Sequence, residues 1–127
     1  MTNFRLLSCT NIQAIIDPCR SSSIWIASGA AMPEYIYIIH PFRHGFFESP
    51  TPKEAAILEE HFHYLQVAAR AGTVLLAGPC TDDTFGLVIF RAANEDAARA
   101  FMFNDPSVKD NVMVAELHPM HISIHGQ

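Results

Sequence analysis

The hydrophobic positions between residues 51 and 71 recur with the period of an amphipathic helix. On a wheel of about 100° per residue, Phe62, Leu65 and Ala69 fall within about 40° of Leu58 and form one apolar stripe. Because such a stripe is stable when it is buried, the pattern predicts a helix that packs against another layer of the protein.

Both ends of this helix carry recognisable signals. Thr51 stands at the N-cap, with Pro52 in the first turn and Glu54 at the third position of a capping box. Gly72 stands where a helix ends, and glycine takes the left-handed conformation there without a Cβ clash. The helix is therefore predicted to run from Thr51 to about Ala71.

The other apolar segments predict strands and a second helix. Runs rich in β-branched and aromatic residues lie at Tyr35–His40, Thr73–Ala77, Phe85–Arg91, Val112–Leu117 and Met120–Ile124. Pro41 should end the first strand, and Pro119 should interrupt the last segment. The second helix is expected over Glu95–Phe103, with Asn94 as its N-cap.

This order of elements, β-α-β-β-α-β, predicts a ferredoxin-like α+β fold: an antiparallel four-stranded sheet with two helices on one face. The first strand, Tyr35–His40, has almost no polar side, so the open face of the sheet should also be covered. A second subunit is the simplest cover, which predicts a homodimer.

The first 31 residues do not share this pattern. Neither a helical nor a strand period holds for more than a few residues, although Ile24 to Ala27 form a short apolar island. We therefore predict two parts, an N-terminal extension over residues 1–31 that is mostly disordered and a single domain over residues 32–127.

Composition excludes several classes of function. The formal net charge of −5, with 8 Lys and Arg scattered along the chain, argues against binding a phosphate backbone, so no nucleic-acid partner is expected. No apolar run reaches the length of a membrane span. The 3 cysteines form no CxxC pair, which favours a reducing cytoplasm over a disulfide framework or a thiolate zinc site.

The stretch from residue 59 to 79 resembles the YCII-related domain family. The matching positions are Glu60-His61, Tyr64-Leu65, Ala71-Gly72, Leu75-Leu76 and Gly78-Pro79, and the likeness extends over about Met32 to Ile124. The resemblance implies a ferredoxin-like domain that dimerises into an α+β barrel, with a site around a helix histidine and an aspartate. The family includes a dehydrochlorinase that acts on a chlorinated hydroxyhydroquinone.

The two histidines of the helix are expected to lie in different environments. On the wheel, His61 lies about 60° from the centre of the apolar stripe, whereas His63 points roughly 140° away, into water. A partly desolvated imidazole suits proton transfer, so His61 is the candidate catalytic residue, as the family resemblance also implies. The alternative is a histidine that only satisfies a neighbouring carbonyl.

An aspartate could orient this imidazole, and three are available. Asp82 and Asp83 follow Gly78-Pro79, where they are either site residues or ordinary turn residues. We favour Asp83 as the catalytic partner and Asp82 as a substrate contact. Asp105, in Asp105-Pro106, is expected to stop the second helix by bonding its own backbone, ahead of one extra turn at Ser107–Asp110.

Four further residues are candidates for binding a substrate. Phe46 and Phe47 stand together in a polar loop, where they either pack under the loop or wall an apolar pocket. Tyr64 and Cys80 are placed near the same pocket, although a cysteine there is also a common small filler. His61 and His63 lie about 200° apart and cannot chelate one ion, so neither a metal nor another cofactor is expected.

Three functions fit this sequence. The first is a cofactor-independent lyase or isomerase that acts on a small, cyclic or aromatic polar substrate, with His61 as the proton carrier. The second is a module that binds a small ligand without catalysis, and the third is an accessory dimer with no ligand. An enzyme needs His61 beside an acid in an open pocket, whereas a binding module needs only the pocket.

Overall fold

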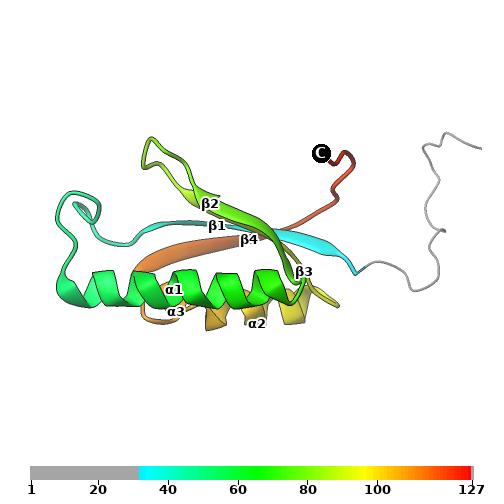
Figure 1. Ribbon diagram of the computed structural model, residues 1–127, viewed down its shortest axis with the longest axis horizontal. Helices are drawn as coiled ribbons and strands as arrows, with labels where there is room; N and C mark the ends of the chain where they lie inside the picture. Colours follow the sequence, from blue (N-terminus) through cyan, green and yellow to red (C-terminus); the bar gives the residue numbers. More distant parts are fainter. Residues whose placement is uncertain (1–31, 127) are drawn as a thin grey trace, which may run out of the picture. The chain divides into compact units, whose positions relative to one another are not determined.

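A computed structural model describes residues 32–126 of the protein (Figure 1). Its elements are β1 (Glu34–Pro41), α1 (Pro52–Arg70), β2 (Val74–Pro79), β3 (Gly86–Arg91), α2 (Glu95–Asn104), α3 (Pro106–Lys109) and β4 (Met113–Met120). The strands form one antiparallel sheet in the order β2-β3-β1-β4. The helices lie on one face of this sheet, so the predicted ferredoxin-like α+β fold is confirmed. The extension predicted for residues 1–31 lies outside the described residues.

The signals at the ends of α1 act as predicted. The Thr51 side chain accepts a hydrogen bond from the Glu54 backbone N–H at 3.1 Å, and Glu54 accepts one from the Thr51 backbone N–H at 2.9 Å. These two bonds complete the capping box. At the other end, Gly72 has a φ of 85°, which is the left-handed conformation expected of it.

The core lies between the sheet and the helices. Alternate residues of β1 face this layer, so Tyr35, Tyr37 and Ile39 are buried, whereas Ile36 and Ile38 are half-buried on the opposite face. On β3, residues Val88 and Phe90 stand opposite Tyr37 and Tyr35, and both are almost completely buried. The predicted apolar character of the open face is therefore present in β1.

The prediction for the last strand was wrong in one respect. A single strand, β4, runs through Pro119, and residues 121–124 form no strand. Because β4 is at the edge of the sheet, it pairs only with β1, and a residue without an N–H costs at most one bond of the ladder there. No helix within residues 32–126 is long and apolar enough to cross a membrane.

Candidate active site

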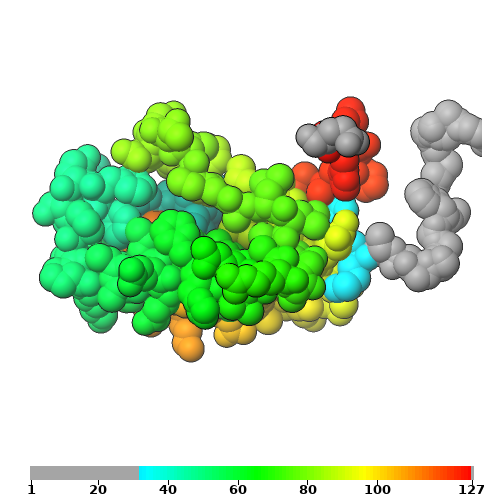
Figure 2. All heavy atoms as spheres, in the orientation of Figure 1, coloured from blue at the N-terminus to red at the C-terminus, as the bar shows by residue number. Residues whose placement is uncertain are grey.

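A cavity of about 320 Å³ lies between α1 and the strands β2 and β3. In the space-filling view, α1 runs along one face below the loop of residues 42–50 and the β2–β3 hairpin, and the surface is hollowed between them (Figure 2). Within the described residues, the only side chains of the lining that carry a polar or ionisable group are His61, Gln66 and Cys80. The cavity therefore suits a ligand with a largely apolar body.

The apolar stripe of α1 forms one wall of this cavity. All four of its predicted members, Leu58, Phe62, Leu65 and Ala69, line the cavity. The burial differs from the wheel, because the Phe62 side chain is 49% exposed and His61 is only 5% exposed. His61 lies deeper than predicted because α1 also packs against the short helix α3, which the wheel could not include.

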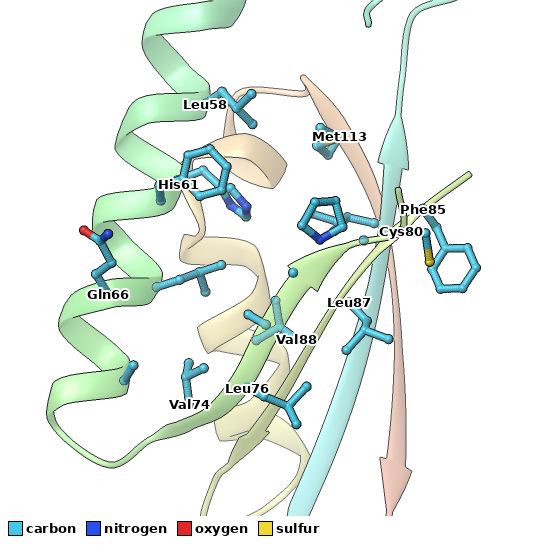
Figure 3. Close-up of a pocket in the computed structure, with 18 of the residues that line it drawn as sticks. Leu58, His61, Gln66, Val74, Leu76, Cys80, Phe85, Leu87, Val88 and Met113 are labelled. Atoms are coloured by element: carbon cyan, nitrogen blue, oxygen red, sulfur yellow. The ribbon is translucent and has the colours of Figure 1, made fainter. Parts of the chain in front are cut away.

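The His61 imidazole is held by the carboxylate of Asp105. Its Nδ1 atom lies 2.8 Å from Oδ1 and 2.9 Å from Oδ2 of Asp105, which is 0% exposed. Asp105 ends α2 and begins α3, so the loop between these helices brings the acid to the middle of α1. In Figure 3, His61 projects from α1 toward the strands that form the opposite wall.

Asp105 is surrounded by hydrogen-bond donors. Ser107 donates its backbone N–H at 2.9 Å and its hydroxyl at 2.8 Å to Oδ1, and Tyr37 donates its hydroxyl at 2.6 Å to Oδ2. Burial by itself raises the pKa of Asp105, but the hydrogen bond with His61, together with the bonds from Tyr37 and Ser107, lowers the pKa below its usual value. The carboxyl group is therefore ionised at neutral pH.

An ionised carboxylate fixes the proton on the imidazole. It only accepts hydrogen bonds, so Nδ1 of His61 must be the donor in this pair. The other ring nitrogen, Nε2, makes no hydrogen bond with any residue in 32–126, and His61 lines the cavity. Nε2 is therefore the nitrogen that a molecule in the cavity could reach.

The structure does not bring Asp82 or Asp83 to His61. Both are exposed in the turn between β2 and β3, where Asp82 accepts two bonds from Thr84, and neither lines the cavity. Asp83 has a φ of 64°, a conformation that aspartate tolerates in turns. The pairing expected between Asp83 and His61 is thus replaced by the pairing of Asp105 with His61.

Only some of the other candidate residues line the cavity. Phe47 lines the cavity and is 42% exposed, whereas Phe46 is buried under it with the two rings 5.2 Å apart, edge to face. Tyr64 points elsewhere, because it stacks on Phe101 and donates its hydroxyl to the Phe101 carbonyl at 2.8 Å. Cys80 lines the cavity, as predicted.

The loop that carries Phe47 is anchored to the start of α1. Arg43 donates to both carboxylate oxygens of Glu54, at 2.9 and 2.7 Å, and to the Ser49 carbonyl at 2.8 Å. The bond from Arg43 lowers the pKa of the Glu54 carboxyl to about 2. Because Glu54 also belongs to the capping box, one side chain joins the helix terminus to the wall of the cavity.

Tyr37 and Ser107 were not predicted as parts of the site. A signal for Tyr37 was present, because a tyrosine on the inward side of a buried strand needs a partner for its hydroxyl. Ser107 had a weaker signal as the second residue after a helix-capping aspartate. His63 is exposed, as predicted, and no group of three metal-ligating side chains occurs within residues 32–126.

The chain is thus a small α+β protein with a histidine–aspartate pair at a cavity. The sequence profile of the YCII-related domain family matches residues 35–121, and the chain belongs to this family. Among curated proteins, none matches the chain.

The chain is similar in fold to solved structures, one of which has a bound ligand. This structure is the 5-chloro-2-hydroxyhydroquinone dehydrochlorinase from Burkholderia phenoliruptrix AC1100 in complex with 2,5-dihydroxybenzoquinone. The two chains are 21% identical with a TM-score of 0.53, and the match covers 68% of this chain and 93% of the dehydrochlorinase. At this identity the similarity establishes the fold alone.

Proposed function

We propose that this protein is a small-molecule enzyme of the lyase or isomerase type in which His61, oriented by Asp105, moves a proton on a small cyclic or aromatic polar substrate. One observation carries the proposal. The imidazole is almost fully buried and bound by Asp105 through Nδ1, yet it lines a cavity of about 320 Å³. A general base needs such a fixed tautomer and such access.

The chemistry requires only the side chains named. Nε2 accepts a proton from an O–H or C–H group of the substrate, and the imidazolium that forms is stabilised by the Asp105 carboxylate. In a lyase, the electron pair of the broken bond moves through the substrate and expels a leaving group as an anion. In an isomerase, the imidazolium returns the proton to a different atom of the same substrate.

The lining indicates the kind of substrate. It contains no Lys, Arg, Asp or Glu side chain among the described residues, so a charged group would be desolvated there without a permanent counter-charge. Phe47 and Phe62 flank the cavity and offer faces for a planar ring. We therefore favour an uncharged ring with a hydroxyl group near His61, bound between these aromatic side chains and Cys80.

The fold neighbour supplies suitable probes. Its substrate, 5-chloro-2-hydroxyhydroquinone, is a neutral hydroxylated ring of the size that we propose, and 2,5-dihydroxybenzoquinone is the ligand in its structure. We expect the full chain to bind neutral hydroxylated six-membered rings such as the chlorinated hydroxyhydroquinone, as measured by calorimetry. If the chain has the proposed activity, chloride should be released from the chlorinated ring, or its absorption spectrum should change.

The two helix histidines provide the matched test. His61→Ala should abolish turnover of any probe that the natural protein converts, and His63→Ala should leave the rate unchanged. Loss of turnover in His63→Ala with retention in His61→Ala would refute the proposal. Binding of the probes by both the natural protein and His61→Ala, without conversion by either, would instead favour the alternative function of a non-catalytic ligand-binding module, for which the apolar lining alone suffices.

We also propose that the protein is a cytoplasmic homodimer joined through its sheet faces. The support is the apolar side of β1, where Ile36 and Ile38 are only half-buried on the face opposite the helices. A second copy would cover them, and the cysteine pattern of the sequence favours a reducing compartment. Light scattering at micromolar concentration should give the mass of a dimer, and the mass of a monomer would contradict this part of the proposal.

A further inference from the structure

We infer that Tyr37 and Ser107 are positioning residues that hold Asp105 as a pure acceptor and so keep His61 as a neutral base with its free lone pair on Nε2. This inference rests on the proposed function for the reaction that the base performs. The predicted protonation state of the imidazole does not rest on that function, because it can be measured without a substrate.

The Asp105 carboxylate is saturated with hydrogen-bond donors. Three donors other than His61 bind it: the backbone N–H and the hydroxyl of Ser107 at Oδ1, and the hydroxyl of Tyr37 at Oδ2. Such bonds stabilise the ionised carboxylate and lower its affinity for a proton. The carboxylate therefore accepts the Nδ1–H bond of His61 without taking the proton.

The donors around Asp105 also change the charge that His61 experiences. A buried carboxylate with no other donor would direct its full negative charge at the imidazole and favour the imidazolium. The hydroxyls of Tyr37 and Ser107 share that charge, because their own dipoles point at the same two oxygens. They therefore weaken the preference of Asp105 for the imidazolium, the form that has no lone pair to accept a proton.

Neither Tyr37 nor Ser107 can act on a ligand directly. Tyr37 and Ser107 are both 0% exposed, and neither lines the cavity. Tyr37 comes from β1 and Ser107 from α3, so their bonds tie Asp105 to two elements of the fold at once. They act on the reaction only through Asp105 and His61.

The other titratable groups near the imidazole are few. Cys80 lies on the wall of the cavity formed by the β2–β3 hairpin, and Tyr64 lies three residues after His61 on α1. Burial, and next the charge of Asp105, raises the pKa of the Tyr64 hydroxyl to about 12, so it stays neutral near pH 7. Asp105 is thus the charged partner to which the effects of Tyr37 and Ser107 apply.

Tyr64 offers a matched control for Tyr37. Both tyrosines pack against Phe101 and donate their hydroxyls, but Tyr64 donates to a backbone carbonyl and Tyr37 to Asp105. Tyr37→Phe and Tyr64→Phe each remove one hydroxyl from the same aromatic cluster. Only the first removes a donor from the carboxylate.

The experiment is a pH titration of the full-length protein followed by NMR of the histidine ring nitrogens, with the His61 signals assigned by their loss in His61→Ala. In the natural protein at neutral pH, the proton should be on Nδ1 and absent from Nε2. Tyr37→Phe and Ser107→Ala should each raise the midpoint of the His61 titration by about 0.5–1 pH unit, because a charge-assisted bond to Asp105 is lost. Tyr64→Phe should leave the midpoint in place.

Two results would overturn the inference: a neutral His61 that carries its proton on Nε2, or equal midpoints in Tyr37→Phe and Tyr64→Phe. If Tyr37→Phe does not fold, Ser107→Ala decides the question, because it removes one hydroxyl and keeps the backbone N–H bond. Failure of the proposed function appears differently, as an absence of turnover with the predicted titrations intact. Where a substrate is turned over, kcat/KM falls on the acid side of its pH profile, and the midpoint of this fall should move to higher pH in the same variants.

Discussion

Two acidic turns of this protein look alike in the sequence and differ completely in the structure. Asp105 stands beside Pro106 at the end of α2, and Asp82-Asp83 follow Pro79 at the end of β2. Asp105 is completely buried and bonded to four donor groups, including His61. Asp82 and Asp83 are exposed and serve the geometry of their turn.

This difference shows that turn chemistry and a role in a site are not exclusive alternatives. Asp105 accepts from the Ser107 backbone as the N-cap of α3, which is the local role expected of it. The same oxygen also faces Nδ1 of His61, a residue 44 positions away in the sequence. Local signals identified the first role, and only the packing of α3 on α1 revealed the second.

The largest expected effect comes from replacing Asp105 with asparagine, and the same replacement at Asp83 is the matched comparison. Asp105→Asn removes the charge that binds His61 and places a donor group among other donors, so it should lower the free energy of unfolding by about 3–5 kcal/mol. Asp83→Asn should change it by less than about 0.5 kcal/mol, since the side chain is exposed and asparagine tolerates a positive φ. Chemical denaturation of both variants measures the two free energies of unfolding. A costly Asp83→Asn beside a harmless Asp105→Asn would reverse the comparison.

The dependence of stability on pH should isolate the same carboxylate. The pKa of Asp105 is lowered in the folded protein, so the folded state stays ionised where the unfolded chain binds a proton. Its contribution is therefore complete above the unfolded pKa of about 3.9 and is lost as the pH falls below that value, with a slope that approaches about 1.4 kcal/mol per pH unit. Denaturation curves between pH 5 and about pH 2 should show this loss.

The natural protein should lose more stability in that range than Asp105→Asn, because the variant has no acid to protonate at this position. Parallel pH dependences in the two proteins would mean that other carboxylates account for the whole acid transition. Glu54 titrates in the same range, so Glu54→Gln is the appropriate second control.

His61 and His63 should differ in stability as they differ in burial. His61→Ala leaves the buried Asp105 without one partner and opens space beside the cavity, which should cost about 1–3 kcal/mol. His63→Ala removes an exposed side chain and should cost less than about 0.5 kcal/mol. Thermal unfolding of both variants tests this expectation. Similar losses in the two variants would contradict the difference in burial between His61 and His63.

The smallest expected effect concerns the backbone of the exposed turn. Asp83 has a φ of 64°, so Asp83→Gly should leave the stability unchanged or raise it by less than about 1 kcal/mol. Asp83→Val should lower it by about 1–2 kcal/mol, because a β-branched side chain is strained in the left-handed region. Their melting temperatures give the comparison, and neither variant should affect the binding of a ligand.

Much of the fold could be predicted because its signals are local. The capping box of Thr51 and Glu54, the glycine at position 72 and the Asn94 cap each satisfy nearby backbone groups, so the sequence around them suffices. Pro119 shows the limit of this reasoning. Its effect depends on whether its strand is central or at an edge, and the order of the strands decides that.

Only half of the His61–Asp105 pair could be predicted from the sequence. His61 was identified because it lies at the edge of the apolar stripe, where it is partly desolvated, and because it matches the family histidine. Its partner was predicted as Asp83, whereas the structure pairs His61 with Asp105. Asp83 and Asp105 have equally ordinary surroundings in the sequence, and the hydroxyl of Tyr37 is 68 positions from Asp105. Contacts of this range depend on the packing of whole elements, and periodicity does not report it.

The strand edges have a consequence for how copies of the protein meet. The sheet has two edges, β2 and β4, and each contains a proline, Pro79 in the first and Pro119 in the second. Proline lacks the N–H that a neighbouring chain would need, and its ring obstructs a close approach. Continuous growth of the sheet from molecule to molecule, the first step toward fibrous aggregates, is therefore discouraged at both edges, and contact through the face opposite the helices meets no such obstacle.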